Sequence, residues 1–284
     1  MTAPHRVGVV GAGTMGAGLA QCLAEAGLTV TVVEPDTTAT ARARRDIRGS
    51  VRAMALLRPG SDVTRLAEAV AGIRWTAEAA ELHDADLVIE SVTERIDLKR
   101  AVFAELDRLC RPETVLASGT SAIPIADLAA RTSRPHRVLG LHFMNPAPLT
   151  GTVEVITTTE TAPDTLAAAL DLLTVLGKRG IVVGDRPGFV INRILMLVIA
   201  EAADVTADGT DAETVDALFE GCLGHRMGPL RTADLIGLDN VADTLAVLRE
   251  TTGEDRYRVP EPLAALVRAG HLGRKSGRGF HVYA

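Results

Sequence analysis

A glycine-rich segment near the start of the chain has the spacing of a phosphate-binding turn. Residues Gly11-Ala12-Gly13-Thr14-Met15-Gly16 spell G-x-G-x-x-G between an apolar run and a helical pattern. Glycines at these positions allow a tight turn and let backbone N–H groups approach a pyrophosphate closely. An apolar run, this loop, a helical pattern and a second apolar run follow each other in the order of a dinucleotide-binding unit. We therefore predict a dinucleotide site at this loop.

An acidic residue follows the second apolar run, which covers residues 29–33. The carboxylate of Glu34 can accept hydrogen bonds from an adenosine ribose, and it would repel a 2′-phosphate. The sequence therefore favours NAD over NADP as the cofactor. Arg42, Arg44 and Arg45 keep NADP open as a minor alternative, and Glu34 could also be an ordinary solvated strand end.

A histidine and a glutamate have the residue types of a general base and its partner. His142 lies near the end of the apolar run 138–143, just before the polar, proline-bearing segment 144–148. Ligands of open parallel sheets bind beyond the carboxyl ends of the strands, where a histidine could take a hydroxyl proton as hydride leaves. Glu154, on the next predicted strand, could hold the ring in one tautomer and raise its basicity. A structural histidine and a half-exposed strand carboxylate are the plain alternatives.

Polar side chains at two further places could bind substrate or cofactor. Ser118-Gly119-Thr120-Ser121 follows another apolar run. Its hydroxyls could donate to a substrate oxygen and to a nicotinamide carboxamide, or the run could simply cap a helix. Asn192 lies among apolar neighbours in a later helical pattern, where its amide could reach a substrate carbonyl or bridge two helices.

Short apolar runs alternate with longer Ala-rich helical patterns, which is typical of a parallel sheet with crossover helices. The predicted strands are residues 6–10, 29–33, 73–75, 86–90, 114–117, 138–143, 153–157 and 179–183. Helices are predicted at residues 14–26 and 162–176, each followed by a glycine that ends it. These runs predict an α/β fold of the Rossmann type with a mostly parallel sheet.

The pattern changes near Asp185, after which no buried strand run appears. Helical periodicity alone follows, at residues 189–207, 211–221, 230–251 and 262–269. We therefore predict an NAD-binding domain over residues 1–184, with an arginine-bearing helical arm near 36–70. A smaller all-helical domain for substrate binding and dimerisation is predicted over residues 185–284.

Charge and cysteine usage exclude several classes of protein. The chain has 30 Lys and Arg against 36 Asp and Glu, a formal net charge of −6 and no basic run, which disfavours a nucleic-acid partner. Cys22, Cys110 and Cys222 lie far apart without metal-binding spacing, as expected of reduced thiols and of no metal site. No secretory signal or membrane-crossing run is recognisable. We expect a cytoplasmic protein without a membrane partner.

Six motifs spread almost end to end resemble one family, the L-3-hydroxyacyl-CoA dehydrogenases, and in pattern most closely the bacterial 3-hydroxybutyryl-CoA dehydrogenases. The motifs are the glycine loop, VIESVTE at 88–94, LHFMNP at 141–146, PGFVINR at 187–193, MGPL at 227–230 and GRKSGRGF at 273–280. The resemblance implies an NAD-dependent enzyme that interconverts a short L-3-hydroxyacyl thioester and its 3-oxo form. It also implies that the helical domain closes the active-site cleft and forms a homodimer.

The same resemblance implies roles for individual residues. His142 would be the catalytic base and Glu154 its partner, while Ser121 and Asn192 would hold the oxygens of the substrate. Contacts to the dinucleotide would come from Glu34, Glu94, Lys99, Ser121, Asn145 and Lys275.

The chain departs from the family at positions that would face the substrate. Gly119 and Ala122 replace a usual Asn and Ser, Thr150-Gly151-Thr152 stands where Met-Lys-Leu is usual, Arg226 replaces a proline and His271 a tryptophan. If these residues line the acyl pocket, with Arg226 as a substrate contact, the pocket suits a small hydrophilic acyl group rather than an alkyl chain.

The predicted arm also departs from the contacts that the family makes with coenzyme A, a serine and a lysine. Ser50 matches the serine, but Leu57 stands at the lysine position, with Arg52 and Arg58 as candidate substitutes. A thioester on an acyl carrier protein has no adenosine 3′-phosphate and would not need that lysine. The same chemistry on a small polar carrier-bound group, such as glyceryl in polyketide extender-unit biosynthesis, is therefore the rival to coenzyme A, unless the change is neutral. A non-catalytic NAD-binding or structural protein is the remote alternative.

Overall fold

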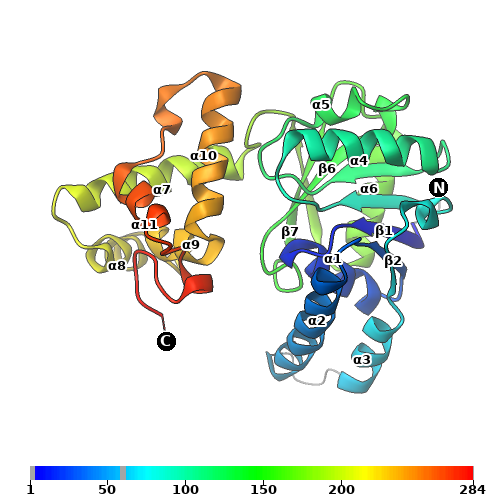
Figure 1. The fold of residues 1–284 in the computed structure, drawn as a ribbon, viewed down its shortest axis with the longest axis horizontal. Helices are drawn as coiled ribbons and strands as arrows, with labels where there is room; N and C mark the ends of the chain where they lie inside the picture. The colour runs from blue at the N-terminus through cyan, green and yellow to red at the C-terminus, as the bar shows by residue number, and fades with distance from the viewer. Residues whose placement is uncertain (1–3, 58–61, 284) are drawn as a thin grey trace. The chain divides into compact units, whose positions relative to one another are not determined.

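The computed structural model describes residues 4–57 and 62–283, and the chain divides into two compact units, Met1–Asp185 and Arg186–Ala284. The first unit contains a sheet with helices on both sides, and the second consists of helices (Figure 1). No helix in the described part of the chain is long and apolar enough to cross a membrane.

Within the described residues, eight strands form one sheet in the order β3-β2-β1-β4-β5-β6-β7-β8 (Figure 1). Neighbouring strands are parallel except β6 and β7, which are antiparallel. Each predicted strand is confirmed, and no strand end differs from the prediction by more than one residue. The strands are β1 (Arg6–Val10), β2 (Thr29–Val33), β3 (Arg74–Thr76), β4 (Leu87–Glu90), β5 (Val115–Ser118), β6 (Val138–Phe143), β7 (Thr152–Thr157) and β8 (Arg179–Gly184).

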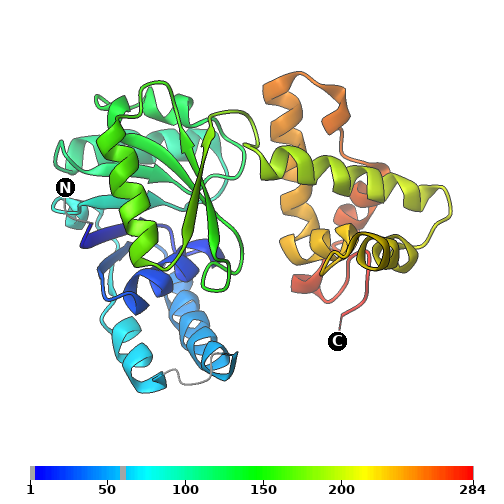
Figure 2. The same ribbon diagram turned by 180° about the vertical axis from the view of Figure 1, so that it is seen from behind.

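Helices cover both faces of this sheet, which explains why its central strands are continuously apolar. Figure 1 shows α4 over one face, and Figure 2 shows α6 over the other. The α-helices of this unit are α1 (Thr14–Glu25), α2 (Thr37–Leu57), α3 (Val63–Ala71), α4 (Ile96–Leu109), α5 (Ile125–Ala129) and α6 (Pro163–Val175). The predicted arm consists of α2 and α3, which pack against each other and against α1.

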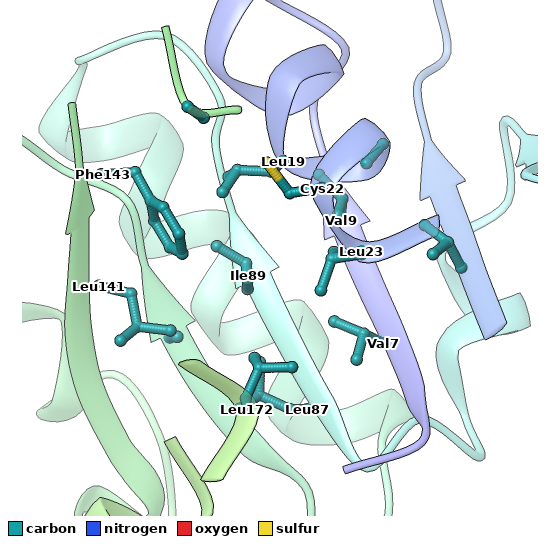
Figure 3. Close-up of a cluster of buried hydrophobic side chains, with 14 of the residues drawn as sticks. Val7, Val9, Leu19, Cys22, Leu23, Leu87, Ile89, Leu141, Phe143 and Leu172 are labelled. Carbon is teal, nitrogen blue, oxygen red and sulfur yellow. The ribbon is translucent and has the colours of Figure 1, made fainter. Parts of the chain in front are cut away.

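Aliphatic side chains fill the core between α1, α6 and the sheet. Leu19 and Leu23 of α1 lie over Val7 and Val9 of β1, and Leu172 of α6 belongs to the same cluster (Figure 3). This packing holds the first turn of α1, and with it the glycine loop, at the carboxyl edge of the sheet.

The second unit contains five described α-helices: α7 (Ile191–Ala207), α8 (Ala212–Leu223), α9 (Pro229–Ile236), α10 (Leu238–Thr252) and α11 (Glu261–Arg268). The single helix expected over residues 230–251 is wrong, because the chain breaks into α9 and α10 at Gly237. This glycine has a φ of 98°, a backbone conformation that no right-handed helix contains.

Two buried aspartates hold the family motifs of the second unit in place. Asp216 accepts the backbone N–H groups of Leu230 and Arg231, each at 2.9 Å. Asp234 accepts those of Phe280 and His281, also at 2.9 Å. The motifs MGPL and GRKSGRGF therefore close the fold of this unit around two carboxylates.

Candidate active site

The glycine loop forms a bare helix N-terminus beside the switch point of the sheet, where β1 has β2 on one side and β4 on the other. Gly11 has a φ of +99°, and a Cβ at Gly16 would lie 2.0 Å from the Gly11 carbonyl oxygen. Gly13 is the N-cap of α1, and no side chain in the described residues caps this helix. The first N–H groups of α1 and the positive end of its dipole are thus directed at a position that suits a pyrophosphate.

Glu34 lies half-buried at the end of β2, directly beside the glycine loop. Its carboxylate accepts the backbone N–H groups of Ala12 at 2.9 Å and of Asp36 at 3.0 Å. A carboxylate has acceptor capacity for further donors, so the hydroxyls of a ribose can bind to it, whereas a 2′-phosphate would be repelled. The geometry of the loop and Glu34 therefore fits NAD.

His142 and Glu154 face each other across the one antiparallel strand pair among the described strands. The register of β6 and β7 places them directly opposite, and Nδ1 of His142 lies 2.6 Å from Oε2 of Glu154. Both side chains are buried, with 4% and 8% of their surfaces exposed. If Nδ1 donates its proton to the carboxylate, Nε2 is the ring nitrogen that accepts a proton. This arrangement is that of a general base with a carboxylate partner.

A network of charged groups holds the segment that contains Ser121. Glu94 accepts the backbone N–H of Ser121 at 3.0 Å and that of Ala122 at 3.3 Å, and it also accepts the Thr120 hydroxyl. The ammonium of Lys99 lies 3.3 Å from Glu94. The structure thus brings together three residues that the resemblance assigns to the cofactor site, Ser121, Glu94 and Lys99.

Two hydroxyls of the run 118–121, those of Ser118 and Thr120, donate to carboxylates of the protein, which leaves Ser121 as the candidate donor of this run to the substrate. Ser118 is buried and donates to Oε2 of Glu90 at 2.7 Å. Thr120 is buried and donates to Glu94. Sequence reasoning did not assign a role to Glu90, although a charged residue at the end of an otherwise apolar strand is a signal of buried pairing.

The segment between β6 and β7, residues 144–151, contains exposed Asn145, which the resemblance assigns to the cofactor. Lys178 holds this segment by donating to the carbonyl oxygens of Ala147 and Thr150, both at 2.7 Å. The hydroxyl of Thr150 donates to the Met144 carbonyl at 3.0 Å. Thr150, which replaces the usual methionine of the family, therefore stabilises the fold of this segment.

The arm offers a cavity of about 360 Å³ between α2, α3 and β3. Arg44, Arg48 and Arg52 line it together with apolar side chains, and the Arg44 guanidinium lies 5.4 Å from the centre of the Trp75 ring. Ser50 is half-buried on α2. Arg58 and the side chain of Leu57 lie outside the described residues.

Three predicted site residues belong to the second unit. Asn192 is buried in the first turn of α7, and Arg226 is exposed between α8 and α9. The ammonium of Lys275 lies 2.5 Å from each carboxylate oxygen of Asp239. His271, at the family's tryptophan position, is half-buried after α11.

Possible metal ligands and the buried thiol of Cys110 were the other candidates for a reactive group. No group of three or more His, Cys, Asp or Glu side chains among residues 4–57 and 62–283 could bind a metal ion. Burial raises the pKa of the Cys110 thiol to about 11, which disfavours its reactive thiolate form.

Family models match both units. The model described as "3-hydroxyacyl-CoA dehydrogenase, NAD binding domain" matches residues 6–186, and the model of the C-terminal domain of the same enzymes matches residues 188–283. A 3-hydroxybutyryl-CoA dehydrogenase of Mycobacterium tuberculosis is 42% identical over 284 residues, covering 98% of both chains. A probable 3-hydroxybutyryl-CoA dehydrogenase of Deinococcus radiodurans is 39% identical over 280 residues, covering 98% of this chain and 100% of that one.

Solved structures have the same fold over nearly the whole chain. The crystal structure of M. tuberculosis FadB2 has a TM-score of 0.94 at 42% identity, covering 99% of this chain and 100% of its own. That of the (S)-3-hydroxybutyryl-CoA dehydrogenase PaaH1 from Ralstonia eutropha has a TM-score of 0.89 at 38% identity, with the same coverage.

Proposed function

The chain belongs to the 3-hydroxyacyl-CoA dehydrogenase family of NAD-dependent oxidoreductases, and we propose that it interconverts a short L-3-hydroxyacyl thioester of coenzyme A and its 3-oxo form. The observation that carries this proposal is the buried His142–Glu154 pair near the carboxyl end of β6. A histidine paired with a carboxylate in this way can act as the general base that removes a proton from a secondary alcohol. The relatives named 3-hydroxybutyryl-CoA dehydrogenases support a four-carbon acyl group.

In the oxidising direction, Nε2 of His142 takes the proton of the C3 hydroxyl. The chemistry that NAD would supply when bound at the glycine loop is acceptance of the C3 hydride, so that the alcohol would lose a proton and a hydride in all. The Glu154 carboxylate, 2.6 Å from Nδ1, stabilises the imidazolium that forms. The Ser121 hydroxyl and the Asn192 amide donate to the C3 oxygen and to the thioester carbonyl and hold C3 in position.

Further contacts complete the proposal. Glu34, Asn145 and Lys275 would bind the dinucleotide, and Glu94 and Lys99 would act on the same site by holding the segment of Ser121. Ser50 and Arg226 would bind the substrate. The arginines that line the arm cavity, Arg44, Arg48 and Arg52, supply positive charge for the phosphates of coenzyme A in place of the family's lysine.

We include a homodimer formed through the second unit in this proposal. Its helices α7 and α8 expose large apolar side chains, Ile194, Leu218 and Leu223. Exposed apolar surface of this kind is typical of a protein interface. Sedimentation equilibrium would give twice the chain mass for a dimer, and the monomer mass would contradict it.

The proposed function is tested by mixing the protein with NADH and acetoacetyl-CoA and following the loss of NADH absorbance. We expect saturable reduction with NADH and much weaker reduction with NADPH. A parallel reaction supplies NAD and glyceryl-loaded acyl carrier protein. Turnover of the carrier-bound group without turnover of acetoacetyl-CoA would reject coenzyme A as the carrier, and no turnover of either would reject the thioester substrate class.

A further inference from the structure

Glu90 is a fully buried carboxylate at the carboxyl end of a central strand. Its side chain has 0% exposure, and β4 lies between β1 and β5 in the sheet. Three donors reach it at 2.7 Å: the Lys99 ammonium and the Val92 N–H on Oε1, and the Ser118 hydroxyl on Oε2. Burial of a carboxylate destabilises a fold unless the charge is paired and hydrogen-bonded. Glu90 has both an ion pair, with Lys99, and hydrogen bonds, from Val92 and Ser118.

Lys99 connects Glu90 to a second carboxylate. Its side chain is 1% exposed, and its ammonium lies 2.7 Å from Glu90 and 3.3 Å from Glu94. The ammonium also donates to the Val92 carbonyl at 3.3 Å. The ammonium thus donates hydrogen bonds to Glu90 and to the Val92 carbonyl, and it forms an ion pair with Glu94 as well. Lys99 therefore acts on the site through Glu94.

Glu94, held by Lys99, in turn holds the backbone of Ser121. One of its oxygens, Oε1, receives the N–H groups of Ser121 and Ala122, while Oε2 faces Lys99. Ser118 adds a second connection, because its Oγ bonds to Glu90 and accepts the N–H of Thr120 at 3.2 Å. Both routes begin at Glu90 and end at the turn that presents the Ser121 hydroxyl.

We propose that Glu90 is a positioning residue of the active site, which sets the Ser121 hydroxyl through Lys99 and Glu94 on one side and through Ser118 on the other. The inference rests on the proposed function, in which that hydroxyl binds the substrate. Without the negative charge of Glu90, Lys99 has Glu94 as its one remaining carboxylate partner in the described residues, and Glu94 turns toward the ammonium. The N–H of Ser121 then follows Glu94, and the hydroxyl leaves its position.

A double-mutant cycle between Glu90 and Ser121 tests this inference. We expect Glu90→Gln to lower kcat/KM for acetoacetyl-CoA roughly tenfold, because a shift of ~1 Å at a reacting group can cost up to 10²-fold. In the Ser121→Ala background the same substitution has nothing left to misplace and is expected to change kcat/KM less than about twofold. Full additivity of the two losses overturns the inference, because Glu90 then acts independently of Ser121.

Ser118→Ala is the milder variant that decides the question if Glu90→Gln does not fold. It removes one hydroxyl donor to Glu90, and we expect a loss of roughly threefold that also disappears in the Ser121→Ala background. Thr114→Val is the matched control. Thr114 directly precedes β5, at the end of the strand far from Ser118, and its buried hydroxyl donates to the Ala85 carbonyl at 2.7 Å. Because this hydroxyl does not contact the network around Glu90, we expect kcat/KM to stay unchanged. Equal losses in Ser118→Ala and Thr114→Val would show a general effect of weakened packing and overturn the inference.

Failure of the proposed function has a different signature. If Ser121→Ala alone keeps full kcat/KM with acetoacetyl-CoA, Ser121 does not bind substrate, and both the role of Ser121 and the inference fall. If Ser121→Ala loses activity while Glu90→Gln folds, binds NADH and keeps full kcat/KM, the inference alone falls.

Discussion

Two clusters of ionisable side chains lie at the carboxyl edge of the sheet and are held in place in different ways. His142 and Glu154 lie on paired strands, whose backbone ladder places them opposite each other. Glu90, Lys99 and Glu94 come from a strand end, a helix and a loop, and bind mainly through side chains. The position of the proposed base thus depends on strand register, whereas that of Ser121 depends on a network of charges.

The difference shows what each kind of support needs. A strand pair needs few side-chain partners, because backbone hydrogen bonds already fix both Cβ positions. A turn has no such ladder, and here side chains accept the N–H groups of Ser121 and Ala122, Glu94 both of them and Thr120 that of Ala122 as well. We therefore expect that a substitution in the first cluster removes a group that takes part in proton transfer. A substitution in the second cluster should instead shift the Ser121 hydroxyl from its position.

The largest effect is expected from His142→Ala. Removal of the base should lower turnover of acetoacetyl-CoA by about 10²–10⁴-fold, while NADH affinity, measured by fluorescence titration, stays unchanged. The control is His136→Ala, which changes an exposed histidine before β6. Similar losses in both variants would contradict the assignment of the base.

Glu154→Gln should produce the next largest loss. The amide can still accept the Nδ1 proton, but it carries no charge to stabilise the imidazolium. We expect kcat to fall about 10–100-fold, as for other partners that orient a histidine, with little change in KM. Glu160→Gln, an exposed site beyond β7, serves as control. A wild-type kcat in Glu154→Gln would show that the pair is structural.

A smaller loss is expected where the loop network is weakened by one hydroxyl. Thr120→Val removes a donor to Glu94 and an acceptor for the Ile123 N–H, 3.0 Å away. A net hydrogen bond is worth about 1 kcal/mol, so steady-state kinetics should show kcat/KM roughly fivefold lower. A loss as large as that of His142→Ala would erase the distinction between the two clusters.

A third buried pair, remote from the loop, should affect stability alone. Arg134 and Asp107 lie 2.7 Å apart with little exposure. Arg134→Met leaves a carboxylate without its partner and should lower the free energy of unfolding by about 3–5 kcal/mol, measured in urea, with kcat unchanged. Arg108→Met, at an exposed site on the same helix as Asp107, should change it by less than about 0.5 kcal/mol. A fall in kcat for Arg134→Met in the folded protein would contradict this separation.

The pair of Asp107 and Arg134 also predicts that the free energy of unfolding depends on pH, although neither residue takes part in the proposed reaction. Burial alone would raise the pKa of Asp107, but hydrogen bonds from Ser133 and Arg134 outweigh it and hold the pKa below its ordinary 3.8. Because the folded pKa is the lower one, this stabilisation is present above about pH 4 and is lost as the pH falls through the folded pKa. Asp107→Asn should remove that part of the acid dependence in urea unfolding curves. An unchanged acid dependence would contradict it.

Features with a local pattern could be predicted from the sequence. Apolar runs identified the strands, and the glycine loop with Glu34 identified the dinucleotide edge. His142 and Glu154 could be paired because consecutive strands tend to be neighbours. Their direct opposition needed the antiparallel register of β6 and β7, which no run length specifies.

Features that depend on where a side chain points could not be predicted. Ser118 and Thr120 turn inward to carboxylates, and the Thr150 hydroxyl binds a backbone carbonyl. The partners of Glu90 could not be predicted either, because no sequence pattern shows that the side chains of Lys99 and Ser118 turn toward its carboxylate. The break between α9 and α10 was missed because helical patterns tolerate single glycines, and only the φ of Gly237 shows the break.

The central claim, that Glu154 holds His142 ready to accept a proton, is tested most directly by the tautomer of the ring. Nitrogen NMR of the histidine-labelled protein, at a pH where the ring is neutral, distinguishes the two nitrogens, and a His142→Gln sample assigns the signals. We predict the proton on Nδ1, which lies 2.6 Å from Glu154, and an unprotonated Nε2. A proton on Nε2 would contradict the account, because the nitrogen assigned as the base would then be a donor.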